Sequence, residues 1–313
     1  MKKTLLSFNL IMLFNNTAVA EIESDFSGSI VFETRYFFDE PLYPQQLSQQ
    51  NFLELKPQYF LNLGDNTQFN FEGFARFSDK DTDSNYIDIR EMMLSHYVGN
   101  FEFYAGIGKV FWGQTESINL VNIINQTDYM ASFDNEEKLG QEMFGVKYFF
   151  NSGSISLYAL PSFNVIDFPS LEGRMRTPIL IDNDKVFYEE VGQEDELQYA
   201  LRFQKTFENL DLGLSYFEGT SRIPELVMTF NSDGRLIFAP KYNLFTQYGI
   251  DLLYLMDDIA LKFEGVQVQT TKGDYFAYVG GFEYTYYGIF DTSYNLGLIM
   301  EYQNDERKDD PMI

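Results

Sequence analysis

The sequence predicts an all-β protein, an antiparallel transmembrane β-barrel of a bacterial outer membrane. Three observations predict it: about thirteen short amphipathic strands, connections that alternate between short and long, and an export signal in a chain without cysteine. A barrel wall alternates apolar lipid-facing and polar interior residues, with tight turns at the periplasmic end and long loops outside. Because closure pairs every strand edge, such a fold needs no disulfides.

Residues 1–20 are predicted to form a cleavable signal peptide. Lys2 and Lys3 provide the basic start, residues 5–14 the apolar segment, and Ala20 ends a small-x-small cleavage motif. The alternative is a transmembrane helix, but the apolar segment is shorter than the roughly 20 residues that a spanning helix needs. We therefore expect a mature chain of residues 21–313. It should form one barrel domain, because no linker or low-complexity block divides it.

The composition is aromatic and polar at the same time. Aromatic residues make up 18% of the chain, with 22 Tyr, 32 Phe and one Trp, yet the mean hydropathy is only −0.24. An apolar wall with aromatic girdles around a polar interior explains this combination. The alternative, a soluble β-sandwich, would have fewer aromatic residues and a less even strand spacing.

Period-2 alternation identifies the strands. In residues 67–77, for example, Phe69 and Phe71 alternate with Asn70 and Glu72, which is typical of a strand with one apolar and one polar face. Most predicted strands have the 9–11 residues of a tilted membrane strand. The expected strands are residues 26–38, 51–63, 67–77, 86–98, 101–110, 143–150, 154–161, 197–207, 210–218, 246–255, 259–268, 275–286 and 293–303.

The connections between these strands predict the topology. Short connections rich in Gly, Asn and Asp suit tight turns and lie at residues 64–66, 99–100, 151–153, 208–209, 257–258 and 288–292. The connections between them are longer or more polar and lie at residues 39–50, 78–85, 111–142, 162–196 and 219–245, with a short exception at 269–274. If the short turns are periplasmic, the mature N-terminus is periplasmic and the long loops are extracellular.

The end of the chain conflicts with this pattern. The thirteenth strand would run outward, whereas bacterial barrels of this kind have an even number of strands. Residues 304–313 end in Pro311, Met312 and Ile313, without a terminal aromatic residue. Either one strand is miscounted or the chain is cut short, and we favour the second explanation.

The formal net charge of −25 limits the partners. Nucleic-acid binders carry basic patches, so the net charge argues against this class. Docking on a bare anionic membrane surface is also disfavoured. The acidic residues are interpreted first as solvated loops. The alternative is a surface that holds divalent cations beside lipopolysaccharide or favours cationic solutes.

The connection at residues 111–142 contains the most distinctive segment. Trp112, the only tryptophan, lies where a strand meets this long loop, and Glu116, Asn125 and Asp128 follow. One interpretation is an interface-belt tryptophan followed by an ordinary surface loop. The other is a constriction loop that folds into the lumen, because its apolar residues 118–124 would be awkward in open water.

A family resemblance appears in the same region. The chain resembles a poorly characterised family of large porin-like outer-membrane barrels of Gram-negative bacteria. The matching residues are Arg90, Glu91, Gly108, Trp112, Gly113, Glu116, Asn125 and Asp128. The resemblance implies a porin-like barrel with several further strands after residue 303, which this chain lacks.

Charged residues on the polar strand faces are candidate lumen residues. Both signs occur, often two residues apart and therefore on one face. They could form ion pairs that fill the lumen, or they could orient polar solutes and set ion preference. The candidates are Glu33, Arg35, Glu54, Lys56, Glu72, Arg76, Arg90, Lys147, Arg202, Lys262, Glu264 and Glu283.

Two further motifs carry weaker signals. Asp79, Asp81 and Asp83 resemble the start of a calcium loop, but Ser84 occupies the position that requires Gly. A solvated loop is favoured over weak divalent-ion binding. His96, the only histidine, has no nucleophile motif around it and is expected to be a lumen or interface residue.

Together these features predict a porin-like channel for passive passage or binding of small solutes. The alternative is a closed barrel whose loops make it an adhesin, a receptor-like protein or a structural outer-membrane protein. We expect no enzyme activity, cofactor or metal, because no phosphate loop, zinc spacing or haem motif occurs. The expected partners are outer-membrane lipid, lipopolysaccharide, small solutes and the barrel-assembly machinery. The sequence leaves the solute and the oligomeric state open.

Overall fold

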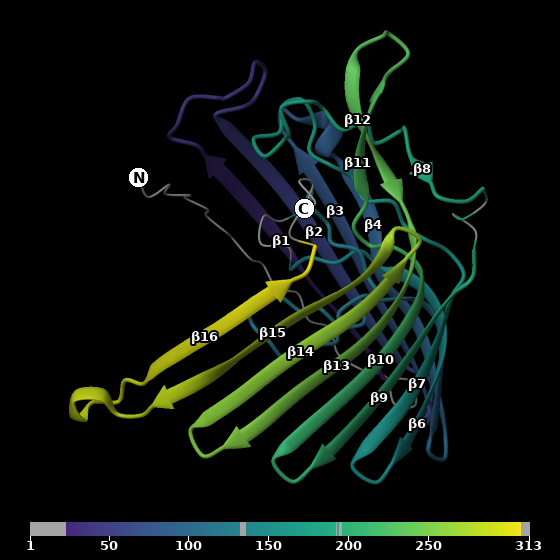
Figure 1. The fold of residues 1–313 in the computed structure, drawn as a ribbon, viewed down its shortest axis with the longest axis vertical. Coiled ribbons are helices and arrows are strands. Elements are labelled where there is room, and N and C mark those ends of the chain that lie inside the picture. The colour runs from purple at the N-terminus through teal and green to yellow at the C-terminus, as the bar shows by residue number, and fades with distance from the viewer. Residues whose placement is uncertain (1–22, 132–135, 192, 194–195, 308–313) are drawn as a thin grey trace.

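A computed structural model describes residues 23–131, 136–191, 193 and 196–307, so the predicted signal peptide lies outside the described residues. Thirteen of the strands form one sheet in which each strand is antiparallel to the next sheet strand along the chain. Figure 1 shows these strands as a tilted, curved wall. The all-β fold predicted from the sequence is confirmed.

The thirteen sheet strands correspond one to one with the predicted strands, with ends that differ by a few residues. They are β1 (Glu23–Tyr36), β2 (Gln49–Asn62), β3 (Thr67–Ser78), β4 (Tyr86–Val98), β5 (Phe101–Gly108), β6 (Gln141–Phe150), β7 (Gly153–Leu160), β9 (Gln198–Phe207), β10 (Leu210–Thr220), β13 (Leu244–Met256), β14 (Ile259–Thr270), β15 (Gly273–Tyr286) and β16 (Leu296–Asp305).

Tight turns join strands at one end of the sheet, which we call the turn end. Gly64 (φ 79°) and Gly99 (φ 57°) occupy the left-handed region there, and a Cβ at either position would have open space. Their φ values are costly for most other residues but not for glycine. The opposite end, the loop end, carries the long connections at the top of Figure 1.

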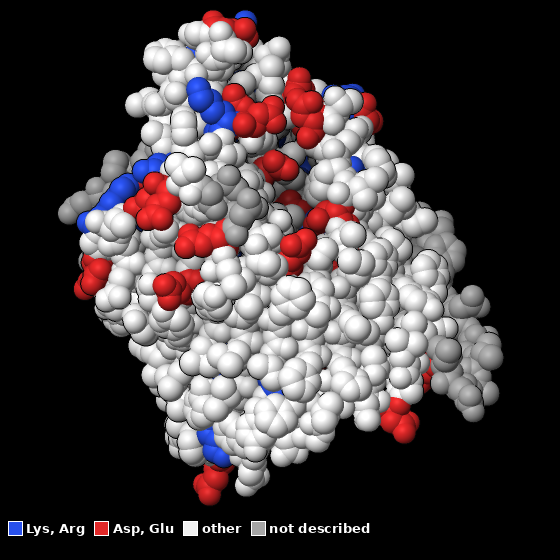
Figure 2. Space-filling model, turned by 90° about the vertical axis from the view of Figure 1, so that its right-hand side faces the viewer, with Lys and Arg blue, Asp and Glu red and all other residues white. Residues whose placement is uncertain are grey.

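The two faces of the sheet differ as the alternation predicts. Large apolar side chains such as Phe103 and Leu157 are about half exposed on the convex face. Their neighbours Tyr104 and Tyr158 point to the concave face, where their rings meet. Figure 2 shows a band with very few charges below the acidic loop end.

A second, small sheet lies at the loop end. It contains β8 (Phe187–Tyr188), β11 (Glu225–Phe230) and β12 (Leu236–Tyr242), in the order β11-β12-β8. The sequence predicts only loops at residues 162–196 and 219–245, so the three strands of this sheet are a correction to that prediction. Strands β11 and β12 form a hairpin whose turn contains Gly234 (φ 76°). Its strands are shorter than most strands of the main sheet and do not follow the regular spacing of those strands.

Short 3-10 helices occur at Thr82–Ser84 (η1) and Ile289–Asp291 (η3). No described helix is both long and apolar enough to span a membrane.

Candidate functional site: a concave face crossed by an inward loop

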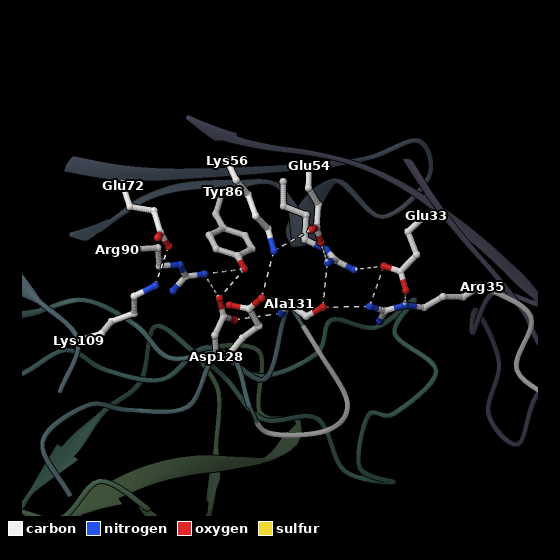
Figure 3. Close-up of polar contacts among 12 residues, drawn as sticks. Glu33, Arg35, Glu54, Lys56, Glu72, Tyr86, Arg90, Lys109, Asp128 and Ala131 are labelled. Atoms are coloured by element: carbon white, nitrogen blue, oxygen red, sulfur yellow. Dashed lines mark hydrogen bonds and ion pairs between the residues drawn. The ribbon is translucent and has the colours of Figure 1, made fainter. Parts of the chain in front are cut away.

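The connection between β5 and β6, residues 109–140, lies across the concave face of the sheet. We call it the inward loop; residues 132–135 are outside its described part. Side chains of β1–β4 contact it on one side, as Figure 3 shows. Side chains of β14 and β16 contact it on the other side. The sheet therefore curls around this loop.

An apolar cluster attaches the middle of the loop to the wall. Trp112, Val121 and Ile124 are buried and belong to one core with residues of β4, β6, β7, β9, β10, β14 and β15. The Trp112 ring lies 5.8 Å from the ring of Tyr158 on β7. Burying side chains of this size contributes about 1.5–3 kcal/mol each, so this cluster gives the loop a strong preference for the interior.

Arg35, Arg76 and Arg90, which we call the arginine ladder, bind the loop to β1, β3 and β4 and form ion pairs with neighbouring carboxylates. Arg76 is fully buried, forms ion pairs with Glu54 and Glu33, and donates to the carbonyl oxygen of Ala131 at 2.8 Å. Arg35 donates to the same carbonyl oxygen at 2.9 Å and pairs with Glu33 at 2.7 Å (Figure 3). Two guanidinium groups therefore hold one backbone carbonyl of the loop.

Asp128 makes the next contact of the ladder. Its carboxylate pairs with buried Arg90 and accepts a hydrogen bond from Tyr86 at 2.6 Å (Figure 3). Its other oxygen accepts the backbone N–H groups of Met130 and Ala131, each at 3.0 Å. The Asp128 side chain thus fixes the loop backbone beside the arginine ladder.

Two lysines complete this side. Lys56 of β2 pairs with Glu137 of the loop at 3.1 Å, and Lys109 at the start of the loop pairs with Glu72 of β3 at 2.6 Å. Unlike the arginines, both lysines remain partly exposed. They are therefore among the charges of the concave face that water can reach.

Glu264 of β14 anchors the opposite side of the loop. Its carboxylate is fully buried and accepts the backbone N–H groups of Gln114 at 2.7 Å and Thr115 at 3.0 Å. It also accepts the Thr115 hydroxyl at 2.8 Å and bonds from Asn119 and Val121. A single carboxylate therefore gathers five donors from the loop.

Glu301 of β16 repeats this pattern nearer the sheet edge. It accepts the backbone N–H groups of Glu116 and Ser117, both at 2.8 Å. Lys262 pairs with Glu116 and with Glu283 at 2.5 Å each, and this contact lowers the pKa of the Glu116 carboxyl. A hollow of about 530 Å³ lies here between the loop and β16.

The wall beneath Trp112 contains a buried ion pair. Arg202 of β9 binds Asp251 of β13 through two bonds of 2.5 and 2.9 Å, and its guanidinium lies 5.3 Å from the Trp112 ring. A Cβ at Gly213 would lie 2.2 Å from the Asp251 carboxylate. Glycine at this position therefore makes room for the pair.

All twelve candidate lumen residues lie on the concave face. Eleven take part in the ion pairs or loop contacts described above. Lys147 lies on the same face, directly opposite Glu102 across β5 and β6, with its amino group 4.9 Å from the ring of Phe149. The candidate constriction residues Trp112, Glu116, Asn125 and Asp128 all lie in the inward loop. Asn125 is buried and ties the loop to the carbonyl oxygens of Gly108 and Leu139 at 2.8 Å each.

Three important residues were not among the candidates: Glu91, Glu301 and Arg222. The Glu91 side chain points to the concave face because of a β-bulge in β4, which the alternation of the sequence does not show. Glu301 shares the strand alternation of its neighbours, which could have identified it. Arg222 is buried just after β10 and donates to the loop carbonyls of Ile123 and Ile124, both at 3.0 Å; no sequence pattern indicates that contact.

The acidic segment at residues 79–83 is divided between different contacts. Asp79 accepts a bond from Asn51 at 2.8 Å, whereas Asp81 is buried and accepts the hydroxyls of Ser84 at 2.7 Å and Ser170 at 2.9 Å. These side chains tie neighbouring loops together. The described residues contain no group of three potential metal ligands.

His96 lies on the convex face. It is exposed, pairs across the strands with Phe103 and Thr67, and its Nδ1 lies 2.8 Å from the Thr67 hydroxyl. Its side chain therefore points away from the concave face and from the loop.

No protein-family model matches the sequence, and no curated protein sequence matches it. Similar solved structures include the FrpB iron transporter from Neisseria meningitidis, with 10% identity over 94% of this chain and a TM-score of 0.46. This chain spans about half, 51%, of that transporter chain.

Two structures of OmpT, an outer membrane protein of Vibrio cholerae, are also similar. The trimer form has 13% identity over 91% of this chain and 90% of its own, with a TM-score of 0.34. The loop L8 deletion mutant has 14% identity over 92% of this chain and 95% of its own, with a TM-score of 0.36. These structural neighbours are Gram-negative outer-membrane proteins.

Proposed function

We propose that this protein is an outer-membrane channel in which small solutes pass or bind along the concave face, narrowed by the inward loop. The observation that carries the proposal is the attachment of this loop at both sides of the sheet. Arg35 and Arg76 hold Ala131 on one side, and Glu264 holds Thr115 on the other. A loop fixed in this way would reduce the cross-section without closing off the whole face.

The convex face supports a place in a bilayer. It exposes large apolar side chains over most of the sheet, and the charges in Figure 2 concentrate at the loop end. Outward Tyr216 and Tyr248 have ring centroids 5.4 Å apart, and Tyr216 donates to Glu218 at 2.5 Å. Such aromatic pairs with a polar tip suit the boundary between acyl chains and headgroups. Outer-membrane lipid and lipopolysaccharide would then surround this face.

The concave face keeps polar side chains within reach of water. Lys56, Glu72 and Lys109 are partly exposed beside the loop. Solutes would diffuse past these groups and exchange water for hydrogen bonds with the wall. We propose passage or binding without covalent chemistry, because His96 points away from this face.

The proposal is tested by single-channel recording of the purified full-length protein in planar lipid bilayers. We expect discrete conductance steps, and larger steps from a variant whose loop residues 114–137 are replaced by a short Gly/Ser linker. Detergent extracts from cells without the gene provide the baseline. A folded wild-type protein that gives no steps above this baseline would refute the channel.

A second candidate function is binding through the surface at the loop end. The β11–β12 hairpin exposes Met228 (64%), Phe230 (61%) and Leu236 (46%). These residues lie on one face, because Phe230 is paired with Leu236 and Met228 is two residues from Phe230. Apolar side chains gathered on a projecting hairpin favour contact with another molecule. Deleting residues 225–242 should leave conductance intact if the protein is a channel, whereas an adhesin or receptor-like protein should lose its binding partner.

A further inference from the structure

A β-bulge turns two consecutive charged residues to the concave face. In the pairing of β3 with β4, Glu72 lies opposite Glu91 and Gly73 opposite Ile89, so Arg90 is the extra residue. In a regular strand, neighbouring side chains point to opposite faces. A bulge can redirect a side chain. Arg90 therefore reaches Asp128, while Glu91 also points inward, in line with buried Met93.

This arrangement puts two carboxylates directly opposite each other. Like charges in this position destabilise a sheet. Both carboxylate oxygens of Glu72 already have partners, because Lys109 donates to one at 2.6 Å and Gln58 to the other at 3.2 Å. Among the described residues, no ion pair includes Glu91. Lys109 therefore pairs with Glu72, and among the described ion pairs no basic side chain neutralises the Glu91 carboxylate opposite it.

Four arginines of the wall are already paired with carboxylates and add little to offset this negative charge. The guanidinium groups of Arg35, Arg76, Arg90 and Arg202 are buried and each contacts at least one carboxylate. Once paired in this way, they give little net positive field along the face.

Further carboxylates add to the negative side. Glu264 and Glu301 are held by loop N–H groups rather than by a basic side chain. Glu102 accepts the hydroxyl of Tyr97 at 3.0 Å, with Lys147 opposite it in the neighbouring strand. The charged groups named above on the concave face and the inward loop therefore have a negative sum, because twelve carboxylates (Glu33, Glu54, Glu72, Glu91, Glu102, Glu116, Asp128, Glu137, Asp251, Glu264, Glu283 and Glu301) outnumber nine basic groups (Arg35, Lys56, Arg76, Arg90, Lys109, Lys147, Arg202, Arg222 and Lys262).

We infer that the channel prefers cations and that Glu91 determines this preference together with Glu72 and Lys109. The inference rests on the proposed channel function and names the class of solute it would favour. Charged rings in pores select ions by such local fields. Because water reaches this place, the effect should weaken when salt screens it.

The test is the reversal potential of the purified full-length protein in a planar bilayer with a KCl gradient around 0.1 M. We expect the wild type to pass K⁺ in preference to Cl⁻. Glu91→Gln should lower the permeability ratio by about two- to threefold, and Lys109→Gln should raise it by a similar factor. Glu142→Gln is the matched control, because Glu142 lies on the convex face beside inward Met143.

The outcomes separate the two claims. Glu91→Gln removes a repulsion and should not weaken the fold, so its channels should form as readily as those of the wild type. Channels that conduct without cation preference, or a Glu91→Gln ratio equal to that of Glu142→Gln, would overturn the inference alone. A wild type without conductance would refute the channel itself and, with it, this selectivity.

Discussion

Glu264 offers the sharpest single-residue test of the inward loop. Replacing Glu264 with Gln keeps the shape of the side chain but removes its charge and one acceptor oxygen. In its place, the amide NH₂ group would face loop donors such as the N–H groups of Thr115 and Val121. We expect residues 113–119 to detach from β14 and become more mobile, with Glu301 of β16 and the arginine ladder as the remaining attachments of the loop.

The magnitude follows from the number of donors involved. A hydrogen bond to a charged group contributes about 1.5–3 kcal/mol, and a buried donor left unsatisfied costs about 1–3 kcal/mol. These contributions do not add fully when they share one acceptor. A net loss of about 3 kcal/mol is therefore reasonable, and it would change the ratio of docked to undocked loop by about two orders of magnitude.

Spin labelling measures this change directly. The chain has no native cysteine, so Ile118→Cys, at an exposed loop position, can be labelled alone. We expect a mobile nitroxide spectrum in Glu264→Gln and a restricted one in the wild type. Glu102→Gln is the matched control, because it removes a carboxylate from the same face without touching the loop. Equal label mobility in Glu264→Gln and the wild type, with equal unfolding midpoints, would refute this account of the anchor.

Three further predictions concern the wall and the loop. Trp112→Ala should destabilise the protein by about 3–5 kcal/mol through lost packing, as measured by the denaturant midpoint in detergent. Arg202→Met should cost about 3–5 kcal/mol because it leaves Asp251 buried without its partner; the double variant with Asp251→Leu should recover much of that loss, and no recovery would contradict the pairing argument. The contact with Lys262 holds the pKa of Glu116 below its ordinary value of 4.5, so its stabilisation should be present above that pH and disappear as the pH falls through the lowered pKa. Thermal midpoints of Glu116→Gln and the wild type should therefore differ at neutral pH and converge in acid, and a constant difference would exclude this contact as the cause.

Local patterns were sufficient to predict the main sheet. Each strand carries its own alternation, and the tight turns between strands contain Gly, Asn or Asp, so neighbouring residues indicate both the faces of a strand and its end at the turn. The small sheet was missed because the β11–β12 hairpin is short and interrupts a segment whose length alone indicated a loop. Its strands give part of the loop end a regular structure where the sequence predicts only long loops.

The contacts of the candidate site depend on residues far apart in the chain. Thr115 and Glu264 are separated by 149 positions, so no spacing rule joins them. Glu264 was predicted as a lumen charge, yet its main contact is with the loop backbone. The position of Glu91 could not be predicted for a different reason. Strict period-2 alternation puts Arg90 and Glu91 on opposite faces, and only the β-bulge puts both on the concave face.

The position of the inward loop in the membrane-embedded protein is the central claim, and cross-linking tests it most directly. Gln303 of β16 donates to the Ser117 hydroxyl at 2.6 Å, so cysteines at these two positions should react with a short bifunctional thiol reagent. In outer-membrane vesicles we predict an intramolecular cross-link for Ser117→Cys with Gln303→Cys, and none for Ser117→Cys with Asp233→Cys in the loop-end hairpin. Failure of the first pair to cross-link, while each cysteine reacts with a single-ended thiol reagent, would contradict a loop that lies against the concave face.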